Sequence, residues 1–487
     1  MPKNNSIRVR FAPAPTGLMH IGNVRTALLN YLFALQNNGT FILRIEDTDP
    51  ERNFDPEAKE ILKDLEWLNI GYDEGPVKGG PYKPYFQSAR TKLYKEYLDK
   101  LFKDKKTAGE QNRTIYRCFC STEDLDKKRN RQIALKQAPR YDKTCLKLTD
   151  QQIEEKLNSK SPFIWRFNVE PNQEINLVDI SKGTIKFNTS HLTDFPLTRQ
   201  DGTFTFLFAN AIDDILMKIT DVFRGEDHLT NSANQLLIYK TLNAPEPRFL
   251  HLPIVCNAEG KKLSKRDKGF SLQDLQNEGF LPEAINNYLA ILGHSFSEEI
   301  LSMQELAKVL NFATPSASQI KYDLEKLKWI NHKWIARLEI DDLVNRCIPI
   351  LKTKYPEIAN LDSNKINELI KLVQPELITL NDISEKTAFF FVKPQIGHKE
   401  LEKIKNYKEN EKGIKNLISK NMDLLDNPEE FINKIKSESK KENFSLAIIF
   451  PVLRLALIGT DHGPNIVDII NILGIKESRE RLLKILV

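Results

Sequence analysis

Cysteine is scarce in this sequence and long apolar runs are missing, and both gaps limit what the protein can be. Five cysteines spread over 487 residues do not make a disulfide framework, so we expect a reducing compartment, the cytoplasm. The most apolar stretch, FSLAIIFPVLRLALIG, is broken by Pro451 and Arg454 and is shorter than the roughly 20 apolar residues of a membrane span. We therefore expect a buried helix there and no membrane partner. The N-terminus runs directly into a strand pattern, which predicts no secretion signal.

A strong excess of one charge is also lacking. The 71 basic and 66 acidic residues leave a net charge of +5, which permits a nucleic-acid partner without requiring one. The length predicts roughly three domains.

The first fifty residues show the pattern of a strand, a loop, a helix and a second strand. Apolar residues alternate in IRVRF and again in FILRI, whereas NVRTALLNYLFALQ places them on one face of a helix. This predicts a parallel β-α-β unit, in which ligands bind beyond the carboxyl ends of the strands. The loop APAPTGLMHIG ends at the unpaired amides of the helix start, which suit an anion. His20 is therefore predicted to lie where a phosphate binds.

A second loop with groups suited to phosphate follows the strand pattern RFLHLPIVCN. In EGKKLSKRDKG, three cations lie within five residues: Lys262, Lys265 and Arg266. Fixed cations stabilise the negative charge that develops during polyphosphate chemistry. A lysine-rich loop alone is more often a solvated surface, but two such loops at strand ends favour a shared nucleotide site.

Seven segments, in order, resemble blocks of the class I aminoacyl-tRNA synthetases, and closely those of the bacterial-type glutamyl-tRNA synthetases. The first resembles the HIGH signature of that family and the fourth its KMSKS loop. The segments are RFAPAPTGLMHIGN, RIEDTD, ANAIDDILMKITDVFRGEDH, KKLSKR, EGFLPEAINNYLAILG, YDLEKLKWIN and LRLALIGTDHGPNIVDIINILG. The resemblance implies activation of glutamate by ATP with Mg²⁺, transfer to tRNA(Glu), and a monomer. Charging of tRNA(Gln) as well is left open.

The expected fold is α/β, a Rossmann-type parallel-sheet catalytic domain with an inserted α+β domain and an all-α C-terminal anticodon-binding region. We expect the catalytic domain to comprise residues 1–85 and 194–257, and the inserted acceptor-stem-binding domain residues 86–193. A stem-contact helical domain with the KMSKS-like loop follows at 258–323, and helical patterns predict the anticodon-binding domain at 324–487.

The resemblance also implies roles for individual residues. Catalysis and ATP binding fall to His20, Gly22, Asn23, Lys262 and Lys265, with Asp227 also at the ATP. Glutamate binding falls to Arg10, Ala14, Glu46, Phe206, Asn210 and Arg224. An arginine fork suits a substrate carboxylate, and Glu46 matches the acid that receives the substrate ammonium. Ala14 and Phe206 depart from the family, because relatives commonly have serine and tyrosine there.

The inserted region contains CFC and YDKTC, where some members of the family bind structural zinc. Cys118, Cys120 and Cys145 match three ligands, and Tyr141 is the only other candidate nearby, since Lys147 stands where some relatives have histidine. Zinc sites normally have four ligands. A zinc site and free buried thiols therefore both stay open.

Three functions compete at this point. The first is a glutamyl-tRNA synthetase, and the second is a smaller tRNA-modifying relative that lacks the helical tail. The third is a tRNA-binding module without catalysis, which would be expected to have lost His20, Glu46 or Lys265. The long helical tail and the presence of these residues favour the first. A small-molecule adenylyltransferase would not need the tail.

Overall fold

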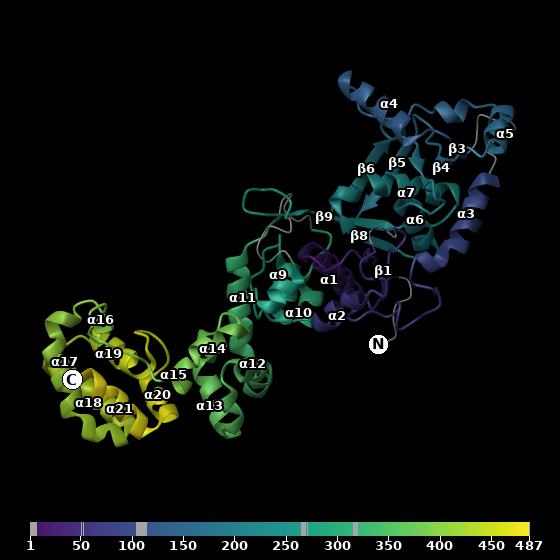
Figure 1. Ribbon diagram of the computed structural model, residues 1–487. Helices are drawn as coiled ribbons and strands as arrows, with labels where there is room; N and C mark the ends of the chain where they lie inside the picture. Colours follow the sequence, from purple (N-terminus) through teal and green to yellow (C-terminus); the bar gives the residue numbers. More distant parts are fainter. Residues whose placement is uncertain are drawn as a thin grey trace. The chain divides into compact units, whose positions relative to one another are not determined.

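The computed structural model describes residues 7–49, 51, 53–103, 114–263, 269, 271–314 and 320–486 (Figure 1). The chain divides into two compact units. Unit 1 comprises Met1–Asp274 and Asn286–Asp323, and unit 2 comprises Leu275–Ile285 and Leu324–Val487. The chain enters unit 2 within helix α8 (Leu272–Asn277) and returns to unit 1 within α9 (Pro282–Ile291).

A largely parallel sheet lies at the centre of unit 1. β1 (Arg8–Phe11) pairs in parallel with β2 (Thr40–Leu43), as the sequence predicted. Four further strands follow in the order β6-β5-β9-β8, and Thr220, next to β8, donates a backbone hydrogen bond to the Arg8 carbonyl of β1. β5, β9 and β8 run parallel, and β6 is an antiparallel edge strand. Their bounds are β5 (Glu174–Asp179), β6 (Gly183–Asn188), β8 (Asp221–Gly225) and β9 (Arg248–Leu252). The fold is therefore α/β with a parallel sheet.

Helix α1 (Ile21–Gln36) connects β1 to β2, and its apolar face is buried. Two further helices, α6 (Phe206–Leu216) and α7 (Leu229–Thr241), flank β8 in the sequence and share a core with β5 and β9. The other helices of this part of unit 1 are α2 (Lys59–Trp67) and α3 (Thr91–Lys103). Burial of these apolar faces against the sheet holds the strand ends, and therefore the loops after them, in fixed positions.

A smaller antiparallel sheet lies in the inserted region. Its order is β3-β4-β7, and two helices accompany it in the sequence. The elements are β3 (Ile115–Cys118), α4 (Thr122–Ala134), α5 (Asp150–Asn158), β4 (Ile164–Phe167) and β7 (Phe195–Pro196). The range 86–193 expected for the inserted domain also contains β5 and β6, and both strands belong to the central sheet. The boundaries of the inserted domain stay a prediction.

The remaining elements of unit 1 follow β9. They are β10 (Val255–Cys256), α10 (Met303–Val309) and β11 (Ile320–Lys321), with β10 and β11 paired in parallel.

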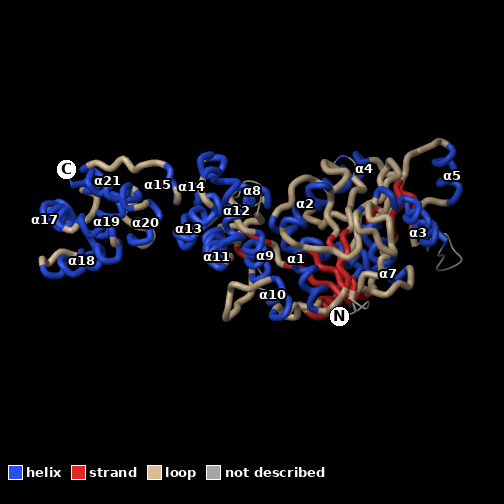
Figure 2. The backbone as a smooth tube through the Cα atoms, turned by 90° about the horizontal axis from the view of Figure 1, so that it is seen from below, coloured by secondary structure: helices blue, strands red, loops and turns tan. Residues whose placement is uncertain are grey.

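The described residues of unit 2 form helices joined by loops, with no strand among them, and Figure 2 draws these helices in blue and the loops in tan. Its helices are α11 (Leu324–Arg337), α12 (Ile340–Lys354), α13 (Ser363–Val373), α14 (Ile383–Lys386), α15 (Ala388–Phe391), α16 (His398–Leu401), α17 (Tyr407–Lys420), α18 (Pro428–Lys441), α19 (Leu446–Ile458), α20 (Ile466–Leu473) and α21 (Ile475–Leu486). The apolar stretch around Pro451 forms α19, whose apolar residues are largely buried, as predicted. Among the described helices, none has the length and apolarity that crossing a membrane requires.

Candidate active site

A cavity of about 650 Å³ opens where β1, β2, β8 and β9 end and α1 begins. This is the edge of a parallel sheet at which ligands usually bind. The cavity brings together eleven of the twelve residues predicted for catalysis, ATP and glutamate. They are Arg10, Ala14, His20, Gly22, Asn23, Glu46, Phe206, Asn210, Arg224, Asp227 and Lys262. The twelfth, Lys265, lies outside the described residues, as does Arg266.

His20 is the N-cap of α1, and its ring is fixed by the backbone of the first turn. Its Nδ1 accepts hydrogen bonds from the amides of Gly22 at 3.1 Å and Asn23 at 3.3 Å. Burial, and next the charge of Lys262, lowers the pKa of His20, so the neutral ring carries its proton on Nε2. A Cβ atom at Gly22 would come within 3.0 Å of this ring. A side chain at this position would therefore crowd the histidine ring, which sequence reasoning did not anticipate.

Asp227 and Lys262 form an ion pair at the exposed side of the cavity. Lys262 Nζ lies 2.9 Å from Asp227 Oδ2, and both side chains remain substantially exposed. The two residues come from distant parts of the chain, the segment after β8 and the loop after β10. The pair therefore places one end of the KMSKS-like loop at the cavity.

Glu46 lies at the buried end of the cavity, held by two donors. Its Oε1 accepts from Asn210 Nδ2 at 2.5 Å and from Arg44 Nη2 at 3.0 Å. Burial raises the pKa of Glu46, and these two contacts oppose that rise. Its second oxygen, Oε2, takes part in neither of these two bonds.

Arg10 and Arg44 share one buried carboxylate. Arg10 Nε donates to Asp214 at 3.1 Å, and Arg44 Nη1 donates to the same side chain at 2.6 Å. Burial alone would lower the pKa of Arg44, but Asp214, Asp213 and Glu46 raise it above its usual value. Sequence reasoning did not single out Arg44, Asp213 or Asp214, although all three lie inside the family-like segments.

Arg224 is buried and is held by neutral groups alone among the described residues. Its Nη1 donates to Gln235 Oε1 at 2.6 Å and to Ser232 Oγ at 3.2 Å, and its Nη2 donates to Asn210 Oδ1 at 3.0 Å. Burial, and next the charge of Arg10, lowers the pKa of Arg224 to about 10. The guanidinium is thus charged at neutral pH without an acidic partner of its own.

One hydrogen-bonded network of buried groups behind the cavity carries one positive charge in excess, and the buried guanidinium of Arg25, which also lines the cavity, lies outside this network. Four guanidinium groups face three carboxylates in a connected network of described residues. The cations are Arg10, Arg44, Arg90 and Arg224, and the anions are Glu46, Asp213 and Asp214. A buried unbalanced charge is costly unless an opposite charge joins it. The cavity is therefore suited to a ligand group with a net negative charge.

Phe206, His228 and Arg199 also line the cavity. Phe206 lies with its ring centroid 6.0 Å from the Arg224 guanidinium and 5.6 Å from the His228 ring. Arg199, which sequence reasoning missed, lines the cavity and donates to the carbonyls of Thr48 and Phe204. Its signal in the sequence was only a turn, TRQDGT, next to the predicted substrate segment.

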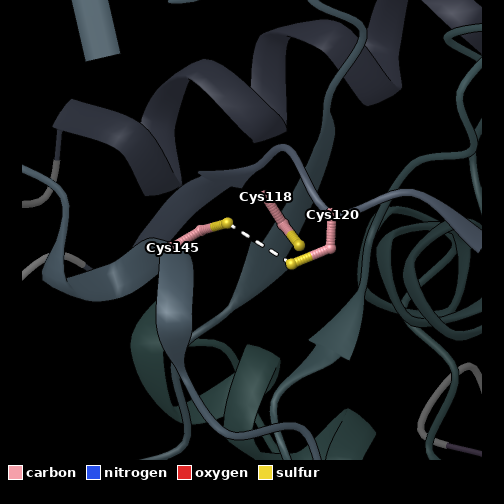
Figure 3. A group of neighbouring side chains, drawn as sticks. All are labelled: Cys118, Cys120 and Cys145. Atoms are coloured by element: carbon pink, nitrogen blue, oxygen red, sulfur yellow. Dashed lines mark hydrogen bonds between the residues drawn. The ribbon is translucent and has the colours of Figure 1, made fainter. Parts of the chain in front are cut away.

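The three cysteines of the inserted region lie together, as Figure 3 shows. The sulfur atoms of Cys118, Cys120 and Cys145 lie within 4.8 Å of one another, and those of Cys120 and Cys145 are 3.6 Å apart. The hydroxyl of Tyr141 lies 3.3 Å from the Cys118 sulfur and 3.5 Å from that of Cys120. Lys147 is exposed. Three sulfurs and one oxygen at this spacing fit the four-coordinate geometry of zinc.

Comparison with known proteins agrees with this site. Residues 6–329 match the family model "tRNA synthetases class I (E and Q), catalytic domain", and residues 342–486 match "Anticodon binding domain". The chain belongs to the class I tRNA synthetases of the glutamate and glutamine group. It is 38% identical to Glutamate--tRNA ligase 1 of Thermoanaerobacter sp. over 490 residues, which covers 99% of both chains. It is 34% identical to Glutamate--tRNA ligase of Bacillus subtilis over 98% of this chain and 99% of that protein.

A solved structure gives the same result. The chain resembles a glutamate tRNA ligase from Elizabethkingia meningosepticum, crystallised in complex with its amino acid, with a TM-score of 0.86 and 32% identity over 99% of each chain.

Proposed function

We propose that this protein is a glutamate–tRNA ligase of the cytoplasm. It activates L-glutamate with ATP, releases pyrophosphate, and transfers the glutamyl group to the 3′-terminal ribose of tRNA(Glu). The observation that carries this proposal is the Arg224 guanidinium, which is buried, charged and without an acidic partner among the described residues.

The charges of the cavity fit glutamate. At neutral pH, glutamate has two carboxylates and one ammonium, a net charge of −1, whose sign is opposite to that of the buried excess. Arg224 and Arg10 supply guanidinium groups for a carboxylate, and Glu46 supplies a carboxylate for the ammonium. Glutamine carries no net charge and would leave the buried excess unbalanced. Ala14 and Phe206 offer no hydroxyl, so the charged groups must carry the recognition.

The other end of the cavity suits ATP. The neutral His20 ring can donate from Nε2 to a phosphate oxygen, and Lys262 and Lys265 supply cations that stabilise developing negative charge. The α-carboxylate of glutamate attacks the α-phosphorus of ATP in line, and pyrophosphate leaves. Magnesium accompanies ATP mainly through phosphate oxygens and water, which requires few protein ligands.

Charging assays with both amino acids and both tRNAs test the function. We expect the purified protein to charge tRNA(Glu) with glutamate and to give no product with glutamine. Glutamate attached to tRNA(Gln) would show the relaxed tRNA specificity that the sequence leaves open. Attachment of glutamate to an internal base rather than to the 3′ end would instead identify the tRNA-modifying relative. Absence of any adenylate or charged product would leave only the tRNA-binding module.

The inserted region is proposed to hold one structural zinc ion, with Cys118, Cys120, Cys145 and Tyr141 as ligands. Bound zinc would tie the end of β3 to the segment at Cys145 and so stabilise the inserted region. Elemental analysis of protein purified without added metal should find about one zinc per chain. In the variant Cys120→Ser, zinc should be lost, and Cys347→Ser, which alters a buried cysteine of unit 2, should retain it. Well-folded wild-type protein without zinc would identify free thiols.

A further inference from the structure

Three polar side chains that do not line the cavity connect Arg224 to strand β5. The Asp179 carboxylate lies 2.8 Å from His251 Nδ1, and His251 Nε2 lies 2.8 Å from Ser232 Oγ. Ser232 Oγ in turn lies 3.2 Å from Arg224 Nη1. All three side chains are almost fully buried, and they come from β5, β9 and α7, while Arg224 comes from β8.

The hydrogen-bond chemistry fixes the direction of this chain of contacts. Burial alone would raise the pKa of Asp179, but hydrogen bonds from the His251 side chain and from the backbone of Lys182, His251 and Ser181 lower it to about 2. Asp179 is therefore an acceptor only, and His251 Nδ1 must carry a hydrogen. Burial lowers the pKa of His251, which leaves Nε2 of the neutral ring as an acceptor.

Ser232 is consequently an oriented hydroxyl. It has one hydrogen, and His251 Nε2 at 2.8 Å is a nearer acceptor than the His228 carbonyl at 3.2 Å. When the hydroxyl donates to His251, its lone pairs are directed to Arg224. Each group then donates to the next, from Arg224 through Ser232 and His251 to Asp179.

An arginine that binds a substrate carboxylate must be held in one orientation and must also keep its positive charge available. A carboxylate touching Arg224 would fix the guanidinium but would also neutralise it and compete with the substrate carboxylate. A neutral hydroxyl fixes it without cancelling the charge. The carboxylate of Asp179 lies two groups away, where it polarises the hydroxyl and does not pair with Arg224.

We propose that Asp179, His251 and Ser232 are positioning residues. They hold the Arg224 guanidinium in the orientation that binds the side-chain carboxylate of glutamate. This rests on the proposed function. The three residues touch neither ATP nor the reacting atoms, so their contribution is to glutamate affinity.

The test is a double-mutant cycle on pyrophosphate exchange, with tRNA(Glu) present. Ser232→Ala should raise the KM for glutamate about fivefold, the effect of one lost hydrogen bond, and leave the KM for ATP and kcat within twofold. In an Arg224→Gln background, Ser232→Ala should change the glutamate KM no further, because the group it positions is gone. Additive effects would overturn the proposal.

A purely structural role is separated by two further variants. His251→Asn keeps a donor near Asp179 but loses the acceptor for Ser232, so it should raise the glutamate KM in the same direction. Ser478→Ala removes another fully buried serine, in α21 of unit 2, and should leave the glutamate KM unchanged. If Ser232→Ala and His251→Asn lower the melting temperature while the glutamate KM stays within twofold, Asp179, His251 and Ser232 stabilise the fold and do not position Arg224.

The outcomes also distinguish the two proposals. Wild-type protein that fails to activate glutamate overturns the proposed function. If the wild-type protein activates glutamate normally and Ser232→Ala leaves the glutamate KM unchanged, only the positioning role of Asp179, His251 and Ser232 is overturned.

Discussion

Arg224→Gln should lower kcat/KM for glutamate about 150- to 4,000-fold in pyrophosphate exchange. The change removes a buried guanidinium from the network with Asn210 and Gln235, and breaking such a charged contact with the substrate costs about 3 to 5 kcal/mol. The KM for ATP should stay within about twofold, because Arg224 lies among the residues proposed to bind glutamate, whereas His20 and Lys262 are the residues proposed to bind ATP.

Arg224→Lys is the matched control. Lysine keeps the charge but lacks the planar fork that contacts Asn210, Ser232 and Gln235 together. It should therefore recover part of the lost activity. Glutamate activation by Arg224→Gln at the wild-type rate would contradict the assignment of this residue to the substrate carboxylate.

The central fold and the position of the site could be predicted from local patterns. Two-residue alternation before and after a helical repeat is enough to indicate β1, α1 and β2, and the parallel pairing of Arg8 with Thr40 follows from that unit. The carboxyl ends of these strands then give the location of the cavity. The family-like loops add His20 and Lys262, which the structure places in the same cavity.

Features that depend on contacts between distant segments could not be predicted. β6 has the same short alternating pattern wherever it pairs, so the sequence did not indicate that it joins the central sheet beside β5. The neutral surroundings of Arg224 arise from α6 and α7 together, and no local pattern reports them.

Truncation before Leu324 should abolish charging of tRNA and preserve binding of ATP. The cavity lies entirely within unit 1, whose sheet and core are its own, whereas the described helices that match an anticodon-binding domain lie in unit 2. Anticodon bases are open to hydrogen bonding, and without unit 2 their contacts are lost. Lys415 and Lys420, two basic residues of α17, form ion pairs with Glu411 and Glu438, so loss of their charges should weaken tRNA binding less than loss of the base contacts.

The truncated chain keeps residues 275–285 but loses the rest of unit 2, which contacts them. Residues 275–285 belong to unit 2, and within that unit the Leu281 amide donates to Asn331 while Glu283 pairs with Arg346. Nucleotide binding and thermal unfolding of the truncated chain should therefore be measured first, at the same low salt as the charging assay. If the truncated chain binds ATP and still charges tRNA(Glu) as efficiently as the full chain, residues 324–487 do not recognise the anticodon. That result would favour the tRNA-modifying relative.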